Sequence, residues 1–322
     1  MKRRAVLSAG VGACAAVAVA GGTPAWAGEA PTLRAEDVAA ARRMFTHGRY
    51  DQLRQRLSVL LATAHGSAMN GPVGVGRAAQ LLVLASQLAV KQGRIDDAAI
   101  YADTAVITAR RSGRPVLLAA AARAAATPLR RTGRTDQALR LLDEARTHLT
   151  DARPTASVLD AAGMLALTAA YTAAQAHLSA PALHFAALAE ETAGQLTRLA
   201  AAPTEQTPWE LSAPQCTLYR IGVHRELGDP EIALTHARRL STAELPTAER
   251  RARAATDTAR ALLATGDVAG AFAQLQHAKA AAPQEARRPS LRALTAELTA
   301  RRPDLAVQTP GITGLASQPR VR

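Results

Sequence analysis

A glycine followed five residues later by an alanine recurs four times in this chain, and this spacing restricts the folds it can adopt. The pairs are Gly93/Ala98, Gly133/Ala138, Gly228/Ala233 and Gly266/Ala271. Glycine can end a helix because it adopts the left-handed backbone conformation without a Cβ clash. The small alanine then allows the next, antiparallel helix to approach closely. Each pair therefore predicts a helical hairpin, and the series predicts an all-α stack.

Two further features of these units support hairpins. An alanine lies seven residues after the first in three units, at Ala105, Ala145 and Ala278. Seven residues are about two helical turns, so both alanines face the same neighbour. An aspartate lies near the expected start of each second helix, at Asp96, Asp136, Asp229 and Asp267. The helix dipole favours negative charge there.

The complete pattern resembles the tetratricopeptide (TPR) repeat. The last unit fits best, because Pro283 follows Gly266, Ala271 and Ala278 at the expected spacing. The unit at Gly228 fits less well, since Leu240 replaces its second alanine. The resemblance implies an all-α, TPR-like right-handed superhelix of about five to six antiparallel helix hairpins.

The glycines are spaced irregularly, so the repeats are degenerate. Their separations are 40, 95 and 38 residues, and the middle gap has room for about one more hairpin. We place its turn near His177, and expect Gly48 to end an earlier helix. Pro128 lies inside an expected helix and predicts a kink. We expect loops at Met69–Gly76 and Ala201–Pro214, and helices at 35–47, 50–65, 75–92, 95–112, 115–132, 135–149, 155–176, 181–200, 212–227, 230–241, 247–265, 268–281 and 289–301.

A second resemblance covers roughly residues 30–305. The segments Ala35–Val38, Arg43–Phe45, Leu218–Asp229 and Leu245–Arg253 look like the C-terminal half of a group of actinobacterial transcriptional regulators. In those proteins a helix-turn-helix domain precedes a TPR-like half. The resemblance implies a regulatory role in antibiotic production or development. We expect no helix-turn-helix before residue 30, so it does not extend to sequence-specific DNA binding.

The two ends of the chain differ from the repeats. Residues 1–27 begin with Lys2-Arg3-Arg4, continue as an apolar run, and end with Ala25-Trp26-Ala27, which fits a signal-peptidase site. The alternatives are a relic of the linker found in the regulators, left after domain loss, or a mis-assigned start codon, so cytoplasmic and exported locations remain equally open. The run is too short and glycine-rich for a stable membrane anchor. We assign 28–302 to the repeat domain and 303–322 to a disordered tail.

The net charge of +13 admits two interpretations. Paired arginines are dispersed along the chain, mostly at expected helix ends, where the helix dipole favours cations. Aromatic residues make up 3% of the chain and do not alternate with the arginines, which argues against direct nucleic-acid binding. An acidic protein or peptide attracted to an arginine-lined concave face is the better interpretation.

No catalytic, cofactor or metal motif is apparent in the sequence. Cys216 is the one cysteine outside the leader, and we expect it to be a buried apolar residue. The eight histidines form no H-E-x-x-H motif. The Gly71–Gly76 segment lacks the Lys-Ser/Thr of a phosphate-binding loop. We therefore predict a non-enzymatic adaptor or sensor that binds a protein, a peptide or a small effector. An exported envelope scaffold is the alternative, and an all-α enzyme is a distant third.

Residues for partner binding should lie on the first helix of each hairpin, which lines the concave face of such repeats. The candidates are Arg220, His224, Gln80, Gln87, Arg123 and Arg260. Arg220 and His224 are favoured because they lie one turn apart on the same helix. The competing interpretation is that they cap a loop or pair with carboxylates such as Glu226.

The intact mass of the native protein distinguishes the two interpretations of the leader. Export predicts an extracellular product whose intact mass corresponds to a chain that begins at Gly28. A regulator with a relic linker predicts a cytosolic product that retains Met1. The measurement is mass spectrometry of separate cytosolic and extracellular fractions.

Overall fold

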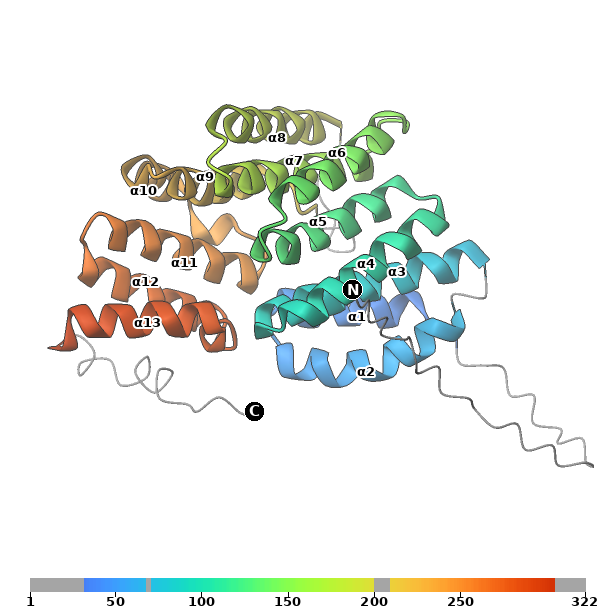
Figure 1. Cartoon of the computed structure of the whole chain (residues 1–322), viewed down its shortest axis with the longest axis horizontal. Coiled ribbons are helices and arrows are strands. Elements are labelled where there is room, and N and C mark those ends of the chain that lie inside the picture. Colours follow the sequence, from blue (N-terminus) through green and yellow to red (C-terminus); the bar gives the residue numbers. More distant parts are fainter. Residues whose placement is uncertain (1–31, 68–70, 200–208, 305–322) are drawn as a thin grey trace, which may run out of the picture. The chain divides into compact units, whose positions relative to one another are not determined.

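The computed structural model describes residues 32–67, 71–199 and 209–304, and these residues form thirteen α-helices (Figure 1). Two short 3-10 helices, η1 at Thr242–Glu244 and η2 at Glu285–Arg287, lie between helices near the C-terminal end. The helices are α1 (Ala35–Thr46), α2 (Tyr50–Ser67), α3 (Gly71–Gln92), α4 (Ile95–Ser112), α5 (Pro115–Arg131), α6 (Thr135–Thr150), α7 (Ala156–Gln175), α8 (Ser179–Leu199), α9 (Ala213–Leu227), α10 (Pro230–Arg239), α11 (Ala248–Ala264), α12 (Val268–Ala281) and α13 (Pro289–Arg301).

Consecutive helices pack as antiparallel pairs, from α1/α2 to α11/α12, and α13 follows the last pair (Figure 1). The described part of the chain thus holds six hairpins. The prediction of an all-α, TPR-like array of about five to six hairpins is confirmed. The predicted helices also agree with the observed ones to within a few residues at most ends.

The turn of every hairpin contains one residue in the left-handed backbone conformation. The φ angles are 70° at Gly48, 78° at Gly93, 75° at Gly133, 56° at His177, 89° at Gly228 and 87° at Gly266. His177 therefore takes the place of the glycine in the α7/α8 hairpin. Ala182 and Ala189 follow it at the same spacing as the alanines after Gly93, Gly133 and Gly266, and both are completely buried. The hairpin signature is therefore also present between Gly133 and Gly228, where no glycine marks the turn.

The small residues of the signature lie where the helices of a pair touch. Each of the seven predicted alanines has no exposed surface, namely Ala98, Ala105, Ala138, Ala145, Ala233, Ala271 and Ala278. The rest of the core is mostly leucine and alanine. Alanine at the contact allows closely spaced helices, and leucine fills the space between neighbouring hairpins.

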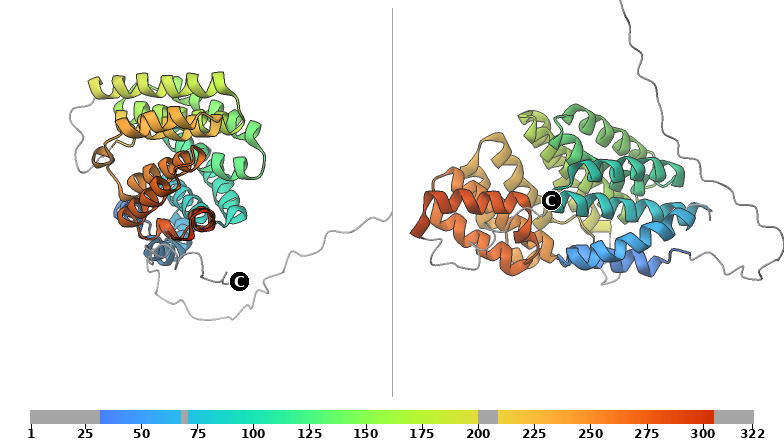
Figure 2. Two further views of the ribbon diagram at one scale, coloured as in Figure 1. Left: turned by 90° about the vertical axis from the view of Figure 1, so that its left-hand side faces the viewer. Right: turned by 60° about the horizontal axis from the view of Figure 1, so that its bottom comes forward.

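The first helices of the hairpins form a closed circuit of contacts. Each first helix contacts the next one along the chain, from α1 through α3, α5, α7 and α9 to α11, and α11 in turn contacts α1. Figures 1 and 2 accordingly place the blue N-terminal hairpin beside the orange C-terminal hairpin. The six first helices therefore surround a common interior.

Buried polar contacts hold this circuit together where the two ends of the array meet. The Lys91 ammonium on α3 lies 2.5 Å from a carboxylate oxygen of Glu249 on α11 and 2.5 Å from one of Glu285 on η2. The Tyr50 hydroxyl donates a hydrogen bond to Glu285. All four side chains are buried, so the contacts operate with little screening by water.

The expected loop at Met69–Gly76 is wrong over Gly71–Gly76, which forms the first turns of α3. Gly76 is buried there, and a Cβ atom on it would lie 3.1 Å from Leu117 of α5. Its small size thus serves close helix packing. Pro128 lies inside α5, and the helix continues past it to Arg131. The leader, most of the expected loop after Ala201 and nearly all of the tail lie outside the described residues.

By length and composition, α3 and α7 are apolar enough to cross a membrane. Both are first helices of their hairpins, and 67% and 56% of their apolar windows are buried against other helices. A helix with hairpins on two sides requires this composition in any case, because most of its surface is core.

Gly93 and Gly133 form a matched pair that tests the contact between the second hairpin and α13. Alanine at either position is strained by the positive φ, at a cost of about 1–2 kcal/mol in the free energy of unfolding. At Gly93 the new Cβ would also lie 2.8 Å from Pro289 of α13, whereas at Gly133 it meets nothing within 4 Å. We expect Gly93→Ala to be more destabilising than Gly133→Ala by a further ~1–3 kcal/mol in urea denaturation. Equal losses would contradict the contact with α13.

Candidate functional site

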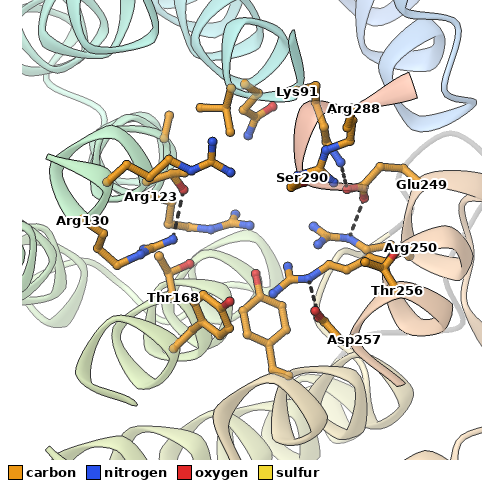
Figure 3. A pocket seen from close by; sticks show the side chains of 18 of the residues that line it. Lys91, Arg123, Arg130, Thr168, Glu249, Arg250, Thr256, Asp257, Arg288 and Ser290 are labelled. Atoms are coloured by element: carbon orange, nitrogen blue, oxygen red, sulfur yellow. Dashed lines mark hydrogen bonds and ion pairs between the residues drawn. The ribbon is translucent and has the colours of Figure 1, made fainter. Parts of the chain in front are cut away.

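A cavity of about 260 Å³ lies inside the circuit, and all six first helices contribute side chains to its wall (Figure 3). Its wall is strongly basic. Two carboxylates, Glu249 and Asp257, line the cavity together with eight cations, which are Lys91, Arg123, Arg130, Arg131, Arg250, Arg253, Arg260 and Arg288. The arginines that are dispersed along the sequence are thus gathered at one site.

The predicted residues fall into two groups. Gln87, Arg123 and Arg260 line the cavity, as expected for polar residues on first helices. Gln80, Arg220 and His224 are also on first helices but do not line it. The predicted role of all six in partner binding stays a prediction.

Arg220 and His224 face a different neighbour. The Arg220 guanidinium forms a bidentate ion pair with Glu190 of α8, at 2.7 and 2.9 Å. The His224 ring stacks on His236 of α10 with centroids 5.3 Å apart, and burial lowers the pKa of both histidines. Tyr219, one residue before Arg220, lines the cavity instead. One residue is about 100° of rotation around a helix, which is enough to change the face.

The carboxylate of Glu210, which belongs to the same chain, occupies one part of the basic region. Its carboxylate lies 3.0 Å from Arg42 of α1, 3.1 Å from Arg123 of α5 and 3.9 Å from Arg250 of α11. Burial alone would raise its pKa, but the three guanidiniums hold it at about 2. Arg123 and Arg250 therefore already bind one carboxylate at the edge of the cavity.

Arg130 has no carboxylate within ion-pair distance among the described residues. Its guanidinium donates hydrogen bonds to the hydroxyls of Thr172 (2.8 Å) and Thr127 (3.1 Å), and its Nε is buried without an acceptor. Its Cζ lies 5.3 Å from the centre of the Tyr171 ring. Burial lowers the pKa of Arg130 because the charged form is poorly solvated there. An anion in the cavity would relieve this cost.

Two tyrosines in the wall experience opposite environments. Arg253 stacks on Tyr219 at 4.2 Å, and Arg250 and Arg123 lie nearby. Burial raises the pKa of Tyr219, but these three guanidiniums outweigh it and lower the pKa to about 7. Tyr171 donates a hydrogen bond to Glu226, and burial raises its pKa to about 12. The region around Tyr219 therefore stabilises negative charge.

Sequence reasoning missed Lys91, Arg130, Tyr171, Tyr219 and Arg253, although part of the signal was present. In the alanine-rich helix α5, Arg123, Thr127 and Arg130 are spaced four and three residues apart. This spacing places all three on one face, and only Arg123 is among the predicted binding residues. No comparable signal identifies Glu210, which lies outside the helices and reaches the arginines through the tertiary fold.

The cavity wall contains neither histidine nor cysteine. Among residues 32–67, 71–199 and 209–304, no group of three or more His, Cys, Asp or Glu side chains is placed to hold a metal ion. Cys216 is buried on α9, as predicted, and burial raises the pKa of its thiol to about 12. What the wall offers is a set of hydrogen-bond donors and positive charges, which suits the binding of an anion.

The chain is similar in structure to BtubC (BKLC) from P. vanneervenii, with a TM-score of 0.43 and 18% identity over 76% of this chain and 89% of that one. It is also similar to a chain of the APC/C hetero-tetramer Cut9-Hcn1, with a TM-score of 0.37 and 12% identity over 87% of this chain and 55% of that one. No protein-family model matches the sequence, and no curated protein matches it. The helix pairing itself defines the class, an all-α helical repeat that resembles TPR proteins.

Tyr219 predicts an optical signal of the basic cavity. We expect a tyrosinate absorbance transition near pH 7 in the full chain, which Tyr219→Phe abolishes and Arg253→Gln moves to higher pH. The folded pKa lies below the ordinary value of 10.0, so ionised Tyr219 stabilises the fold increasingly from pH 7 to 10. This contribution is lost as the pH falls through 7. A wild-type titration that shows no transition below pH 9 would contradict the assignment.

Proposed function

We propose that this chain is a non-catalytic, TPR-like adaptor or sensor whose cavity receives an acidic segment of a protein or peptide partner. The observation that carries the proposal is Arg130, a cavity-lining cation with a buried, unpaired Nε and no carboxylate partner among the described residues. Such an arrangement is costly unless an anion compensates it.

Electrostatic interactions inside the cavity are stronger than on an open surface. The circuit of first helices surrounds the arginines, and a concave site with an excess of one charge sign focuses its field. Glu210 supports the proposal, because it is an acidic side chain already held by Arg123 and Arg250. A carboxylate of a partner would bind in the same way to the guanidiniums of the cavity that Glu210 does not occupy.

The resemblance to actinobacterial regulators leads us to place this binding in the control of secondary metabolism or development. The signal-like leader supports a second setting, in which the same binding module is exported and organises an envelope assembly. The cavity serves either role, and the fate of residues 1–27 separates them.

The test is fluorescence anisotropy with the full chain and a fluorescein-labelled hexaglutamate peptide, with hexaglutamine as the neutral control. We expect hexaglutamate alone to bind, more weakly as salt is added. Arg130→Gln should weaken binding about tenfold, a loss of about 1.4 kcal/mol. It should leave stability unchanged or raised, because it removes an unpaired buried charge.

The matched control is Arg110→Gln, which removes the same charge from the exposed surface of α4, where Arg110 pairs with Glu144. It should leave the affinity unchanged. The double variant Arg220→Ala/His224→Ala measures the contribution of the other predicted face. Equal binding of both peptides, or equal losses in Arg130→Gln and Arg110→Gln, would refute the proposal.

A further inference from the structure

Part of the basic wall is built around one aromatic ring. Arg130 of α5 and Arg253 of α11 lie 5.3 and 5.7 Å from the centre of the Tyr171 ring, and Arg253 also lies over Tyr219. In Figure 3, Arg123 and Arg130 extend from one side of the cavity and Arg250 from the other, toward a common space. The donors thus converge from helices that are far apart in the sequence.

The carboxylates of the chain leave this wall with a large excess of positive charge. Eight cations line the cavity, and four carboxylates form ion pairs with them. Each of the four contacts two of these cations, so none is an exclusive partner. Those carboxylates are Glu210, Glu249, Asp257 and Glu285. One bound carboxylate would neutralise little of the remaining excess, whereas a dianion neutralises twice as much.

The cation without a carboxylate partner among the described residues shows where the dianion would bind. Arg130 donates hydrogen bonds only to the hydroxyls of Thr127 and Thr172, whereas Arg123 already pairs with Glu210. Arg253 lies close to the same Tyr171 ring as Arg130 and over Tyr219. A phosphoryl group presents three oxygens that share close to two negative charges, so it can accept more hydrogen bonds from guanidiniums than a singly charged carboxylate with two oxygens.

The cavity size limits the rest of the ligand. Its volume of about 260 Å³ is below the ~300–1,000 Å³ of pockets that hold drug-sized ligands. The cavity therefore holds one compact group, such as a modified side chain or a small ester, and the rest of an acidic segment would lie outside it.

Building on the function proposed above, we infer that the acidic group recognised in this cavity is a phosphoryl group, bound between Arg130, Arg253 and the Tyr219 hydroxyl. Its source is either a phosphorylated side chain of the partner or a small phosphate ester. A phosphate monoester carries close to two negative charges at neutral pH, and the surrounding arginines favour its fully ionised form.

The test compares a pair of labelled peptides that differ at one position, phosphoserine or glutamate, in a shared acidic sequence. O-phospho-L-serine and free glutamate form the corresponding small-molecule pair. We expect the full chain to bind the phosphoryl member of a pair at least tenfold more tightly. Binding should also raise the pKa of Tyr219, so its tyrosinate absorbance at pH 8 should fall as the ligand is added.

Variants of Arg130 test whether the preference for a phosphoryl ligand depends on the proposed subsite. Arg130→Gln should remove most of the tenfold preference, and Arg130→Lys should restore part of it, because lysine keeps the charge without the planar fork. Arg110→Gln should change nothing. Circular dichroism and thermal unfolding verify that each variant is folded, so a lost preference reports on the subsite.

The outcomes separate this inference from the proposed function. Tighter binding of the phosphopeptide supports both and identifies a modified partner. Binding of O-phospho-L-serine without the peptide supports the phosphoryl subsite and overturns the acidic-segment proposal. Equal affinity for phosphoserine and glutamate peptides overturns the subsite and leaves the proposed function standing. Failure of every probe to bind overturns both.

Discussion

The Lys91 ammonium, held between the carboxylates of Glu249 and Glu285, is the contact on which the rest of the arrangement depends. It joins α3, in the second hairpin, to α11 and η2 at the opposite end of the array. A lysine buried in this way is costly to desolvate, and two carboxylates at 2.5 Å offset that cost. The contact makes the first helices a circuit, and the circuit in turn encloses the cavity.

The position of the arginines inside the circuit explains why electrostatic interactions dominate in the cavity. In an open helical array, arginines on the concave face would be solvated and their charges largely screened. Inside the circuit, Arg130 is destabilised by burial, and Tyr219 is acidified by three guanidiniums. The first effect comes from the loss of hydration on burial, and the second from an excess of positive charge in the same region. Such a region distinguishes an anion from a neutral ligand more strongly than surface charges do.

The sequence was sufficient to predict the hairpins because their determinants are local. A left-handed turn residue marks each unit, two alanines at fixed spacing follow it in four of the six, and the structure buries these alanines completely. The α7/α8 hairpin was positioned correctly even though His177 replaces the glycine. The face of each helix was harder to predict, as the adjacent residues Tyr219 and Arg220 illustrate. Closure of the circuit was not predictable, because Lys91 and Glu285 are 194 residues apart and share no local pattern.

The contact between α1 and α11 also fixes how many units the protein can contain. Open solenoids gain or lose repeats readily, because each unit touches only its immediate neighbours and a new one extends the stack. Here an additional hairpin would separate Lys91 from its carboxylates, and a missing one would leave too short a path to close. Duplication or deletion of a hairpin would therefore break the contacts that close the circuit. Its hairpins must instead vary by substitution within a constant copy number.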